Sequence, residues 1–477
     1  MDDFLYRSVG SNIAQAIGEG ALKAGDRLPS VRSLCRERDL SLATAVAAYR
    51  WLEMEGYIEA RPRSGYFVRA RSAPLRPAKA PVQAAQARLV GVSARNMRLF
   101  ETQRQPGVVQ LGMAIPEPAL FPAEILRRHL NQAALRDPEL LTRYPADARG
   151  LPAFKNAVAR RLAAAGTAVS PEEIVVTAGC AEAINLALRA VTRPGDTVLV
   201  EAPTYYGLLQ MLETHGLKAL EIPSDPFSGP SIAAIEAATR EPGKVQAALL
   251  VPNFANPTGS LMAPADKSKL AALLAERDIC IIEDDVYGDM SHSGERPPLI
   301  KRWDGAGQHI ACGSFNKSLA PGFRIGWMAA GRYRQKIEGL KFESTNAAPP
   351  ILQAALAAYL DGGGFDRHLA RLREQLRRHT ARMAQLVVDH FPPETRLSEP
   401  KGGFVLWVEL APGKNADEIA DRALKQGVAI APGSLFSLDD RFRHCMRLNC
   451  GQAIGPEIEA AIKTLGALAR GVVRYSV

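Results

Sequence analysis

The sequence predicts an α/β fold with a mostly parallel central sheet, preceded by a small unit of helices and a hairpin. Short apolar runs alternate with longer helical patterns over most of the chain, which is typical of a parallel sheet covered by helices. A basic segment rich in Pro and Ala interrupts the chain after residue 70. The 477 residues, 47% hydrophobic and 23% charged, are enough for several globular domains.

The first seventy residues have a pattern of their own. Pro29 and Ser30 open a predicted helix, and a second helix from about Leu42 to Glu55 carries apolar residues at i, i+4 and i+7. Residues 57–68 follow as two short strands around an Arg-Ser-Gly turn. Helix, tight turn, helix and hairpin is the order of a winged helix-turn-helix, whose second helix enters the major groove of DNA.

That order predicts where DNA would lie against this unit. The first turn of the second helix would face base edges or phosphates, and the hairpin would lie on the DNA backbone, with a glycine at its tip permitting close approach. The residues predicted to contact DNA on these grounds are Ser41, Thr44, Arg61, Arg63 and Gly65.

From about Leu5 to Arg69 the chain resembles the DNA-binding head of the GntR-type regulators, in the strings GDRLPSVRSL, AYRWLEMEGYI and SGYFV. The resemblance implies that Arg32 also contacts DNA. One position departs from the family pattern, because Leu42 stands where the recognition helix often carries an arginine. Direct base readout by this helix would then be poorer, or would fall to other residues.

Residues 71–105 are predicted to be a basic Pro/Ala-rich linker between the head, residues 1–70, and the body, residues 106–477. The linker carries 7 Lys and Arg against 1 Glu, whereas the head carries 10 against 9 Asp and Glu, and the whole chain has a net charge of +9. Such a segment either contacts phosphates without reading sequence or is simply solvated.

Composition also limits the compartment and the kind of partner. The six cysteines form no CxxC pair, no apolar run approaches the roughly 20 residues of a membrane helix, and the first residues have no signal-peptide pattern. We therefore expect a cytoplasmic protein with free thiols, no metal site and no membrane partner.

Five apolar runs in the body predict strands of the parallel sheet, and they span residues 173–179, 196–203, 247–253, 279–285 and 309–315. Helical patterns such as residues 181–191 and 264–278 lie between them. Ligands of such sheets bind at the carboxyl ends of the strands. The polar residues of the body gather at these ends, so we expect the functional site there.

A single lysine, Lys317, follows the last of these strands in the string GSFNKSLAPGFRIG. A lysine that forms a Schiff base needs a partly neutral amine, an electrophile held before it and a site for the charged tail of that electrophile. A glycine that ends a strand and opens a helix offers backbone N–H groups to a phosphate, and side chains beside Lys317 offer further donors. The predicted phosphate-binding residues are Gly179, Cys180, Ala181, Ser314 and Arg324.

Other strand ends carry groups that suit a flat, charged ring. Tyr205 can stack on the ring, Asn256 and Tyr287 can hydrogen-bond a phenolate oxygen, and Asp284 can hold a protonated pyridine nitrogen. Together with Lys317, these residues predict a site for pyridoxal 5'-phosphate.

Over residues 108–468 the chain resembles the fold-type I aminotransferases of the aminoadipate/kynurenine type, in the strings EAPTYYG, NPTG, EDDVYG and MRLNCG. The resemblance implies a large PLP-dependent domain with a smaller C-terminal α+β part. It implies an internal aldimine at Lys317, a clamp for a substrate carboxylate at Arg447, and a tyrosine, Tyr144, that reaches the cofactor of the neighbouring subunit. Cys180 replaces a commoner serine at the phosphate loop, which would weaken phosphate binding at most.

Head, basic linker and aminotransferase-like body together resemble the MocR subfamily of GntR-type transcriptional regulators. The resemblance implies a homodimer with heads exchanged between subunits, which binds double-stranded operator DNA and senses an amino acid or amine through aldimine exchange. Three alternatives stay open: an active aminotransferase with a DNA-binding appendage, a sensor of pyridoxal phosphate itself, and a chain whose head serves only as a dimer contact. Every catalytic residue required for transamination is present. A sensor of pyridoxal phosphate itself would need no carboxylate clamp, so Arg447 argues mildly against that alternative.

Overall fold

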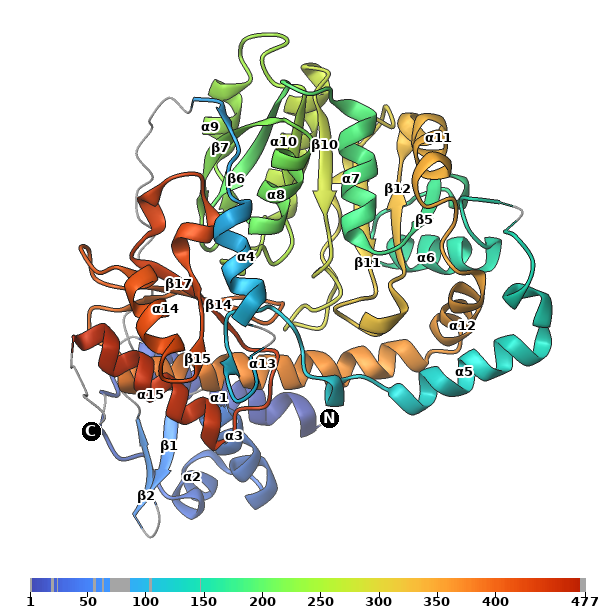
Figure 1. The fold of residues 1–477 in the computed structure, drawn as a ribbon. Coiled ribbons are helices and arrows are strands. Elements are labelled where there is room, and N and C mark those ends of the chain that lie inside the picture. The colour runs from blue at the N-terminus through green and yellow to red at the C-terminus, as the bar shows by residue number, and fades with distance from the viewer. Residues whose placement is uncertain are drawn as a thin grey trace.

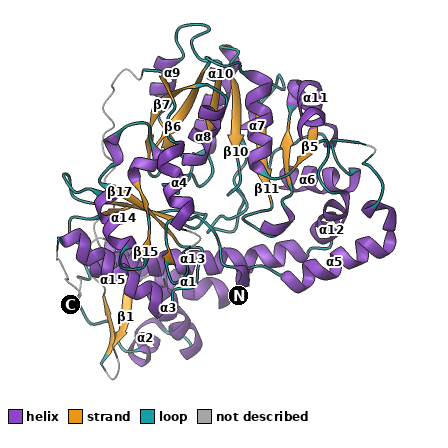
Figure 2. Cartoon of the chain, viewed as in Figure 1, coloured by secondary structure: helices purple, strands orange, loops and turns teal. Residues whose placement is uncertain are grey.

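The computed structural model describes residues 2–18, 21–23, 25–54, 57–61, 64–68, 86–102, 105–145 and 147–471. Within them, a small helical unit at the lower left of Figure 1 is followed by a large sheet packed between helices and by a second, smaller sheet. Figure 2 shows the same view by type of secondary structure. No helix in these ranges is long and apolar enough to cross a bilayer.

The head contains the predicted helix-turn-helix and hairpin. Its elements are α1 (Asp2–Gly18), α2 (Val31–Arg38), α3 (Leu42–Met54) and the antiparallel strands β1 (Ile58–Arg61) and β2 (Gly65–Val68). Ser30 begins α2 by accepting the N–H of Ser33 at 3.1 Å. Leu34, Tyr49 and Leu52 are buried in a core that belongs to the head alone. The winged order is confirmed, and α1 is an element that the sequence analysis missed.

The body is built on a nine-stranded sheet with the strand order β3-β7-β6-β9-β10-β11-β12-β5, and β8 (Gly229–Pro230) pairs with β7. Its parallel strands are β7 (Lys218–Asp225), β6 (Thr197–Ala202), β9 (Ala247–Leu250), β10 (Cys280–Asp284) and β11 (Ile310–Ser314). The strand β12 (Gly326–Ala329) lies antiparallel between β11 and β5 (Ile174–Thr177). All five predicted strands are present, and the mostly parallel sheet is confirmed.

Successive side chains along a strand of the large sheet pack against different helices on the two faces of the sheet. Val198 and Val200 pack with the helices α7 (Cys180–Val191), α8 (Tyr206–Thr214) and α11 (Arg334–Ser344). Leu199, between them in the sequence, packs with α9 (Ile232–Ala238) and α10 (Pro264–Glu276) on the opposite face. Neighbouring side chains of a strand point to opposite faces, so these continuous apolar runs are buried on both sides.

The C-terminal part is an α+β unit, as predicted. The helices α5 (Ala123–Arg136), α6 (Pro152–Ala164) and α12 (Pro350–Asp361) precede or flank the long helix α13 (Gly364–His390). A four-stranded sheet follows, in the order β13 (Arg396–Leu397), β14 (Val405–Glu409), β17 (Cys445–Asn449) and β16 (Ala431–Pro432). The helices α14 (Ala416–Leu424) and α15 (Pro456–Arg470) complete it, and β15 (Val428–Ala429) pairs with β4 (Val109–Gln110).

The predicted linker contains two elements of the body. The strand β3 (Arg88–Leu89) pairs with β7 at the edge of the large sheet, and α4 (Ser93–Thr102) follows it. The carboxylate of Glu213 accepts the N–H groups of Val92 and Ser93 at 2.8 and 3.0 Å, which fixes the start of α4. From Arg88 onward the predicted linker therefore includes elements that pack with the body, and residues 71–85 lie outside the described ranges.

Candidate cofactor site

The predicted cofactor residues meet at the carboxyl ends of the large sheet. Lys317 follows β11, Asp284 is the last residue of β10, and Gly179 precedes α7 at the end of β5. The smaller sheet contributes Arg447 from β17. Both parts of the body therefore build one site.

Lys317 has the electrostatic environment that amine chemistry requires. Its Nζ donates a hydrogen bond to the main-chain oxygen of Ala114 at 2.6 Å. Burial and the neighbouring cations Arg447 and Arg324 together lower the pKa of Lys317 to about 8, against the opposing effect of Asp284. A substantial fraction of the amine is then neutral near pH 8, and a neutral amine is the nucleophilic form.

Asp284 is a buried carboxylate fixed by two donors. The Sγ of Cys180 and the N–H of Val286 each donate to its Oδ1 at 3.2 Å. Burial raises the pKa of Asp284 to about 6, while these hydrogen bonds and Lys317 limit the rise. The carboxylate is mostly ionised at neutral pH, which suits a partner that carries a proton on a ring nitrogen. The thiol of Cys180 thus faces Asp284, a contact that the sequence analysis did not predict.

Arg447 is fully buried and only partly satisfied. Its Nη1 donates to Oδ1 of Asn256 at 2.8 Å and its Nη2 donates to the main-chain oxygen of Gly112. Its Nε is buried and has no hydrogen-bond partner among the residues that the structure describes. A buried guanidinium with an orphaned donor suits an incoming carboxylate, which can take two parallel N–H bonds. The Nδ2 of Asn256 also lies 3.3 Å from the hydroxyl of Tyr287, so these residues form one connected set.

The start of α7 forms a narrow cradle. Gly179 has a φ of +97°, and a Cβ at this position would lie 2.8 Å from Nδ2 of Asn316 and 3.0 Å from Nη2 of Arg324. Free N–H groups and the helix dipole at such an N-terminus favour a phosphate. Ser314 is also buried here and accepts the N–H of Asn316 at 3.4 Å. Asn316 was missed in the sequence analysis, although it directly precedes Lys317, and its Oδ1 is buried without a partner.

The two predicted ring-contacting tyrosines differ in exposure. The ring centre of Tyr205 lies 4.7 Å from that of Tyr206, and burial raises the pKa of Tyr205. Tyr144, by contrast, is 85% exposed on its own chain. Ala181, in the first turn of α7, is exposed as well.

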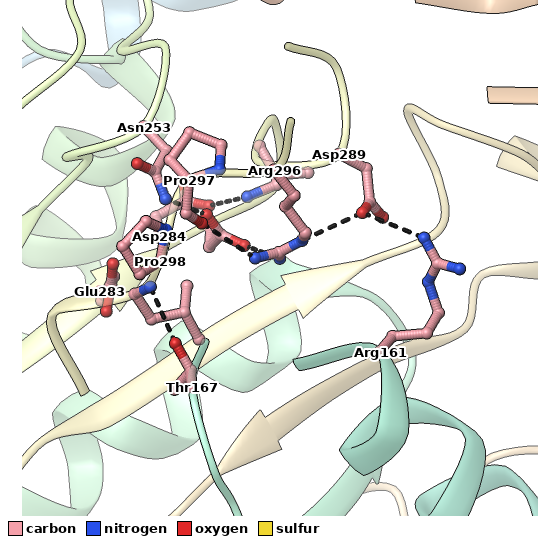
Figure 3. A network of polar contacts seen from close by, with 12 residues as sticks. Arg161, Thr167, Asn253, Glu283, Asp284, Asp289, Arg296, Pro297 and Pro298 are labelled. Carbon is pink, nitrogen blue, oxygen red and sulfur yellow. Dashed lines mark hydrogen bonds and ion pairs between the residues drawn. The ribbon is translucent and has the colours of Figure 1, made fainter. Parts of the chain in front are cut away.

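A buried ionic network behind Asp284 was also missed (Figure 3). Asp285 accepts a hydrogen bond from Nδ2 of Asn253 at 2.7 Å and forms an ion pair with Arg296. Arg296 also forms an ion pair with Asp289 at 3.0 Å. The Nζ of Lys267 donates to Oδ1 of Asn253 at 2.5 Å. The double acid in EDDVYG is the only signal of this network in the sequence. The network holds the end of β10, and therefore Asp284, in place.

The predicted DNA contacts occupy the expected elements of the head. Arg32 lies exposed on α2. Ser41, also exposed, directly precedes α3, and its hydroxyl accepts the N–H of Thr44 at 3.1 Å. Thr44 is only 7% exposed, so it offers the least surface among the described members of the set. Gly65 begins β2 with a φ of +102°.

The cationic side chain of the wing is already engaged on its own surface. The Nε of Arg61 lies 2.8 Å from Glu59, and its guanidinium stacks 4.4 Å from the ring centre of Phe67. Arg63 lies outside the described residues.

Comparison with known proteins accounts for both halves of the chain. Residues 110–453 match the family described as aminotransferase class I and II, and residues 5–68 match the bacterial regulatory proteins of the gntR family. The HTH-type transcriptional regulator YdcR of Escherichia coli is 38% identical over 97% of this chain and 98% of its own length. The probable rhizopine catabolism regulatory protein MocR of Rhizobium meliloti is 28% identical over 90% of this chain and 86% of its own.

The chain belongs to the MocR subfamily of GntR-type transcriptional regulators. A MocR-type regulator binds DNA through its GntR head, and this is the role of the winged unit here. Its body has the fold of the aminotransferases, which makes pyridoxal 5'-phosphate its cofactor.

Solved structures agree with that assignment of the MocR-type body. The kynurenine aminotransferase of Pyrococcus horikoshii matches with a TM-score of 0.74 at 29% identity, covering 81% of this chain and 96% of that one. LysN, the alpha-aminoadipate aminotransferase of Thermus thermophilus, matches with a TM-score of 0.72 at 28% identity, covering 80% and 96%. The residues around Lys317 fit the cofactor that this fold implies, because the cradle at Gly179, the ionised Asp284 and the orphaned donor of Arg447 each match a different part of a phosphorylated pyridine and its ligand.

Proposed function

We propose that this MocR-type regulator senses an amino acid, or another amine, at Lys317 and passes the signal to its DNA-binding head. The observation that carries the proposal is Arg447, a fully buried guanidinium with an orphaned Nε in the same site as Lys317. A site that recognised only the phosphorylated cofactor would have no use for this second anion-binding group. An amino acid, which brings both an amine and a carboxylate, would use both residues.

Each residue of the site has a distinct task in this proposal. When bound, pyridoxal phosphate supplies an aldehyde that combines reversibly with primary amines. Lys317 provides the amine that holds the cofactor and gives way to the ligand. Arg447 orients the carboxylate of the ligand by a bidentate pair. Asp284 keeps a proton on the ring nitrogen, and the cradle of α7 holds the phosphate.

The dimer belongs to the proposal as well. Tyr144, 85% exposed on its own chain, would lie against the cofactor of the partner subunit. Two heads on one dimer would meet paired half-sites on DNA, so a shift between the subunits would change how well both heads fit. The ligand acts only by binding one arrangement more tightly than the other.

The test is the visible absorbance of the cofactor-loaded protein during titration with a panel of amino acids and amines. We expect one ligand class to shift the absorbance saturably without formation of keto acid, and Lys317→Ala to abolish covalent cofactor uptake. Accumulation of keto acid would instead favour the second candidate function, an active aminotransferase. The specific observation behind that candidate is that Lys317, Asp284 and Arg447 are all present and in contact range of one site.

DNA binding is tested separately by gel shift on the DNA upstream of the coding sequence. We expect a specific complex that Arg32→Ala weakens, whereas replacement of Arg128, exposed on α5, leaves it unchanged. A chain that binds cofactor and ligand but no DNA would overturn the regulatory half of the proposal alone.

A further inference from the structure

A cavity of about 1180 Å³ opens on the body away from the predicted cofactor residues. It lies between α6, the end of α12, the first turns of α13 and the loop of residues 294–302. None of its lining residues belongs to the predicted cofactor set. The charged residues that line it are Arg160, Arg161, Arg296, Arg302, Arg373, Glu295, Asp361 and Asp366.

The cavity is lined by five arginines and by three acidic residues. Arg160 pairs with Asp361 at 2.5 Å, and Arg161 pairs with Asp366 at 2.8 Å. Arg302 and Arg373 have no carboxylate in ion-pair range among the described residues. Glu295 likewise has no cation in ion-pair range among these residues, so two guanidinium groups and one carboxylate of the cavity remain without an ion-pair partner.

The floor of the cavity is rigid. Arg296 is held between the carboxylates of Asp285, which is buried, and Asp289, and Asp289 also lies 3.6 Å from Arg161 (Figure 3). Arg373 donates to the main-chain oxygens of Asp289 and Gly294 at 2.7 and 2.6 Å. Side chains fixed in this way lose little entropy when they bind a ligand.

We propose that this cavity binds a small oxyanion with at least two negative charges, such as a phosphate ester or a polycarboxylate. Planar guanidinium groups present paired N–H donors that match phosphate and carboxylate oxygens. A doubly charged ligand would neutralise the two unpaired cations, Arg302 and Arg373. The ligand would touch α6 and the 294–302 loop on one side and α13 on the other. It would therefore tie the large sheet domain to the helix that leads into the C-terminal part.

The experiment is calorimetric titration of pyrophosphate into the full-length, cofactor-loaded protein at constant ionic strength. The loaded cofactor occupies the phosphate cradle at Gly179, which keeps that site out of the measurement. We expect one saturable site per chain, with affinity lowered about tenfold or more by Arg302→Gln and by Arg373→Gln. Arg128→Gln on α5 removes an equal surface charge elsewhere and should leave the affinity unchanged. A parallel titration with citrate distinguishes a polycarboxylate ligand from a phosphorylated one.

Two results would overturn the proposal. One is the absence of saturable binding by either anion. The other is an equal loss of affinity in the Arg128 and Arg302 variants, which would mean general attraction to a basic surface. Arg373 also donates hydrogen bonds to two main-chain oxygens, so the folding of its variant is checked by circular dichroism and thermal melting. The exposed Arg302 carries the test if the Arg373 variant does not fold. The result does not depend on whether an amino acid binds at Lys317.

Discussion

At the scale of single residues, the site combines a lysine and an aspartate whose pKa values are moved toward each other. Burial lowers the pKa of Lys317 to about 8 and raises that of Asp284 to about 6. Between these values Asp284 is ionised, while the neutral fraction of Lys317 grows with pH. The site therefore passes from a mainly cationic to a mainly neutral lysine within about two pH units.

Capture of pyridoxal phosphate by the cofactor-free protein should accelerate as pH rises through about 8, because the neutral amine of Lys317 is the reactive form. The unfolded chain keeps its lysines protonated up to about pH 10.4, so between pH 8 and that value the same residue also makes folding more favourable as pH increases. Stopped-flow absorbance from pH 6.5 to 9.5 measures the rate. A flat profile over that range would mean that Lys317 has an ordinary pKa.

Arg447→Ala should separate amino acids from simple amines. Loss of the buried guanidinium removes charge-assisted hydrogen bonds to a carboxylate, worth about 3 kcal/mol, so the dissociation constant of an amino-acid ligand should rise about a hundredfold. Amines without a carboxylate should bind as before. Absorbance titrations measure both, and Arg443→Ala, at a mostly exposed position of the same part of the body, is the control. Equal losses for both ligand classes would point to a structural role for Arg447.

At the scale of elements, the two proposed binding functions both fall at the start of a helix. The start of α7 holds Gly179 in the cradle, and the start of α3 presents the predicted DNA contacts. In both cases the functional surface comes from the first turn, where backbone N–H groups have no partner within the helix.

Gly179→Ala should weaken cofactor binding at least tenfold. Its positive φ is strained for alanine by about 1–3 kcal/mol, and the new Cβ would press on Asn316 and Arg324, where we propose that the phosphate binds. Gly195→Ala is the matched control, because Gly195 has a φ of +91° but nothing within 4 Å of its Cβ position. Fluorescence titration of the cofactor gives both affinities. Equal weakening in the two variants would assign the effect to backbone strain alone.

Leu42→Arg should strengthen DNA binding. Leu42 is 61% exposed in the first turn of α3, so an arginine there would reach a phosphate or a base edge without disturbing the core. Gel shifts over a range of salt concentrations should show a logarithmic salt slope steeper by about 0.9, which is the effect of one added phosphate contact. The uncharged variant Leu42→Gln should keep the original slope. An unchanged slope in Leu42→Arg would mean that this turn does not face DNA.

The elements that the sequence analysis recovered are those whose signal is local. The five predicted strands are continuous apolar runs between turn residues, and their burial on both faces explains why the signal is strong. The strand β7 was missed because it includes Lys218, Glu221 and Asp225, and β12 because it is short and begins with glycine. The hydrogen bond from the thiol of Cys180 to Asp284 could not be predicted, because it depends on how α7 packs against β10.

At the scale of the whole molecule, the site draws on parts of the chain that are far apart. Lys317 and Asp284 come from the large sheet and Arg447 from the small one, and we propose that Tyr144 serves the partner subunit. An arrangement of this kind would make relative movement of the parts sensitive to what occupies the site. The head is joined to the body through the segment that enters the large sheet at β3.

Mixed dimers should restore one functional site from two defective chains. Lys317→Ala removes the amine of its own site, and Tyr144→Phe should impair the site of the partner. In a mixed dimer, one site then combines an intact Lys317 with an intact Tyr144 from the other chain. The ligand-induced absorbance change should recover to about half of the wild-type amplitude per dimer, as expected for sites shared between symmetric subunits. No recovery after verified subunit exchange would place Tyr144 outside the partner's site.

The two main cations of the site rest on main-chain acceptors. Lys317 donates to the oxygen of Ala114 and Arg447 donates to that of Gly112. A peptide carbonyl survives every substitution that preserves the path of the backbone, so point mutation cannot delete either acceptor directly. A change to another small side chain at the buried position 114 would therefore leave the acceptor of Lys317 in place. A comparison of side chains among relatives would overlook this segment, although its main-chain oxygens accept the hydrogen bonds of Lys317 and Arg447.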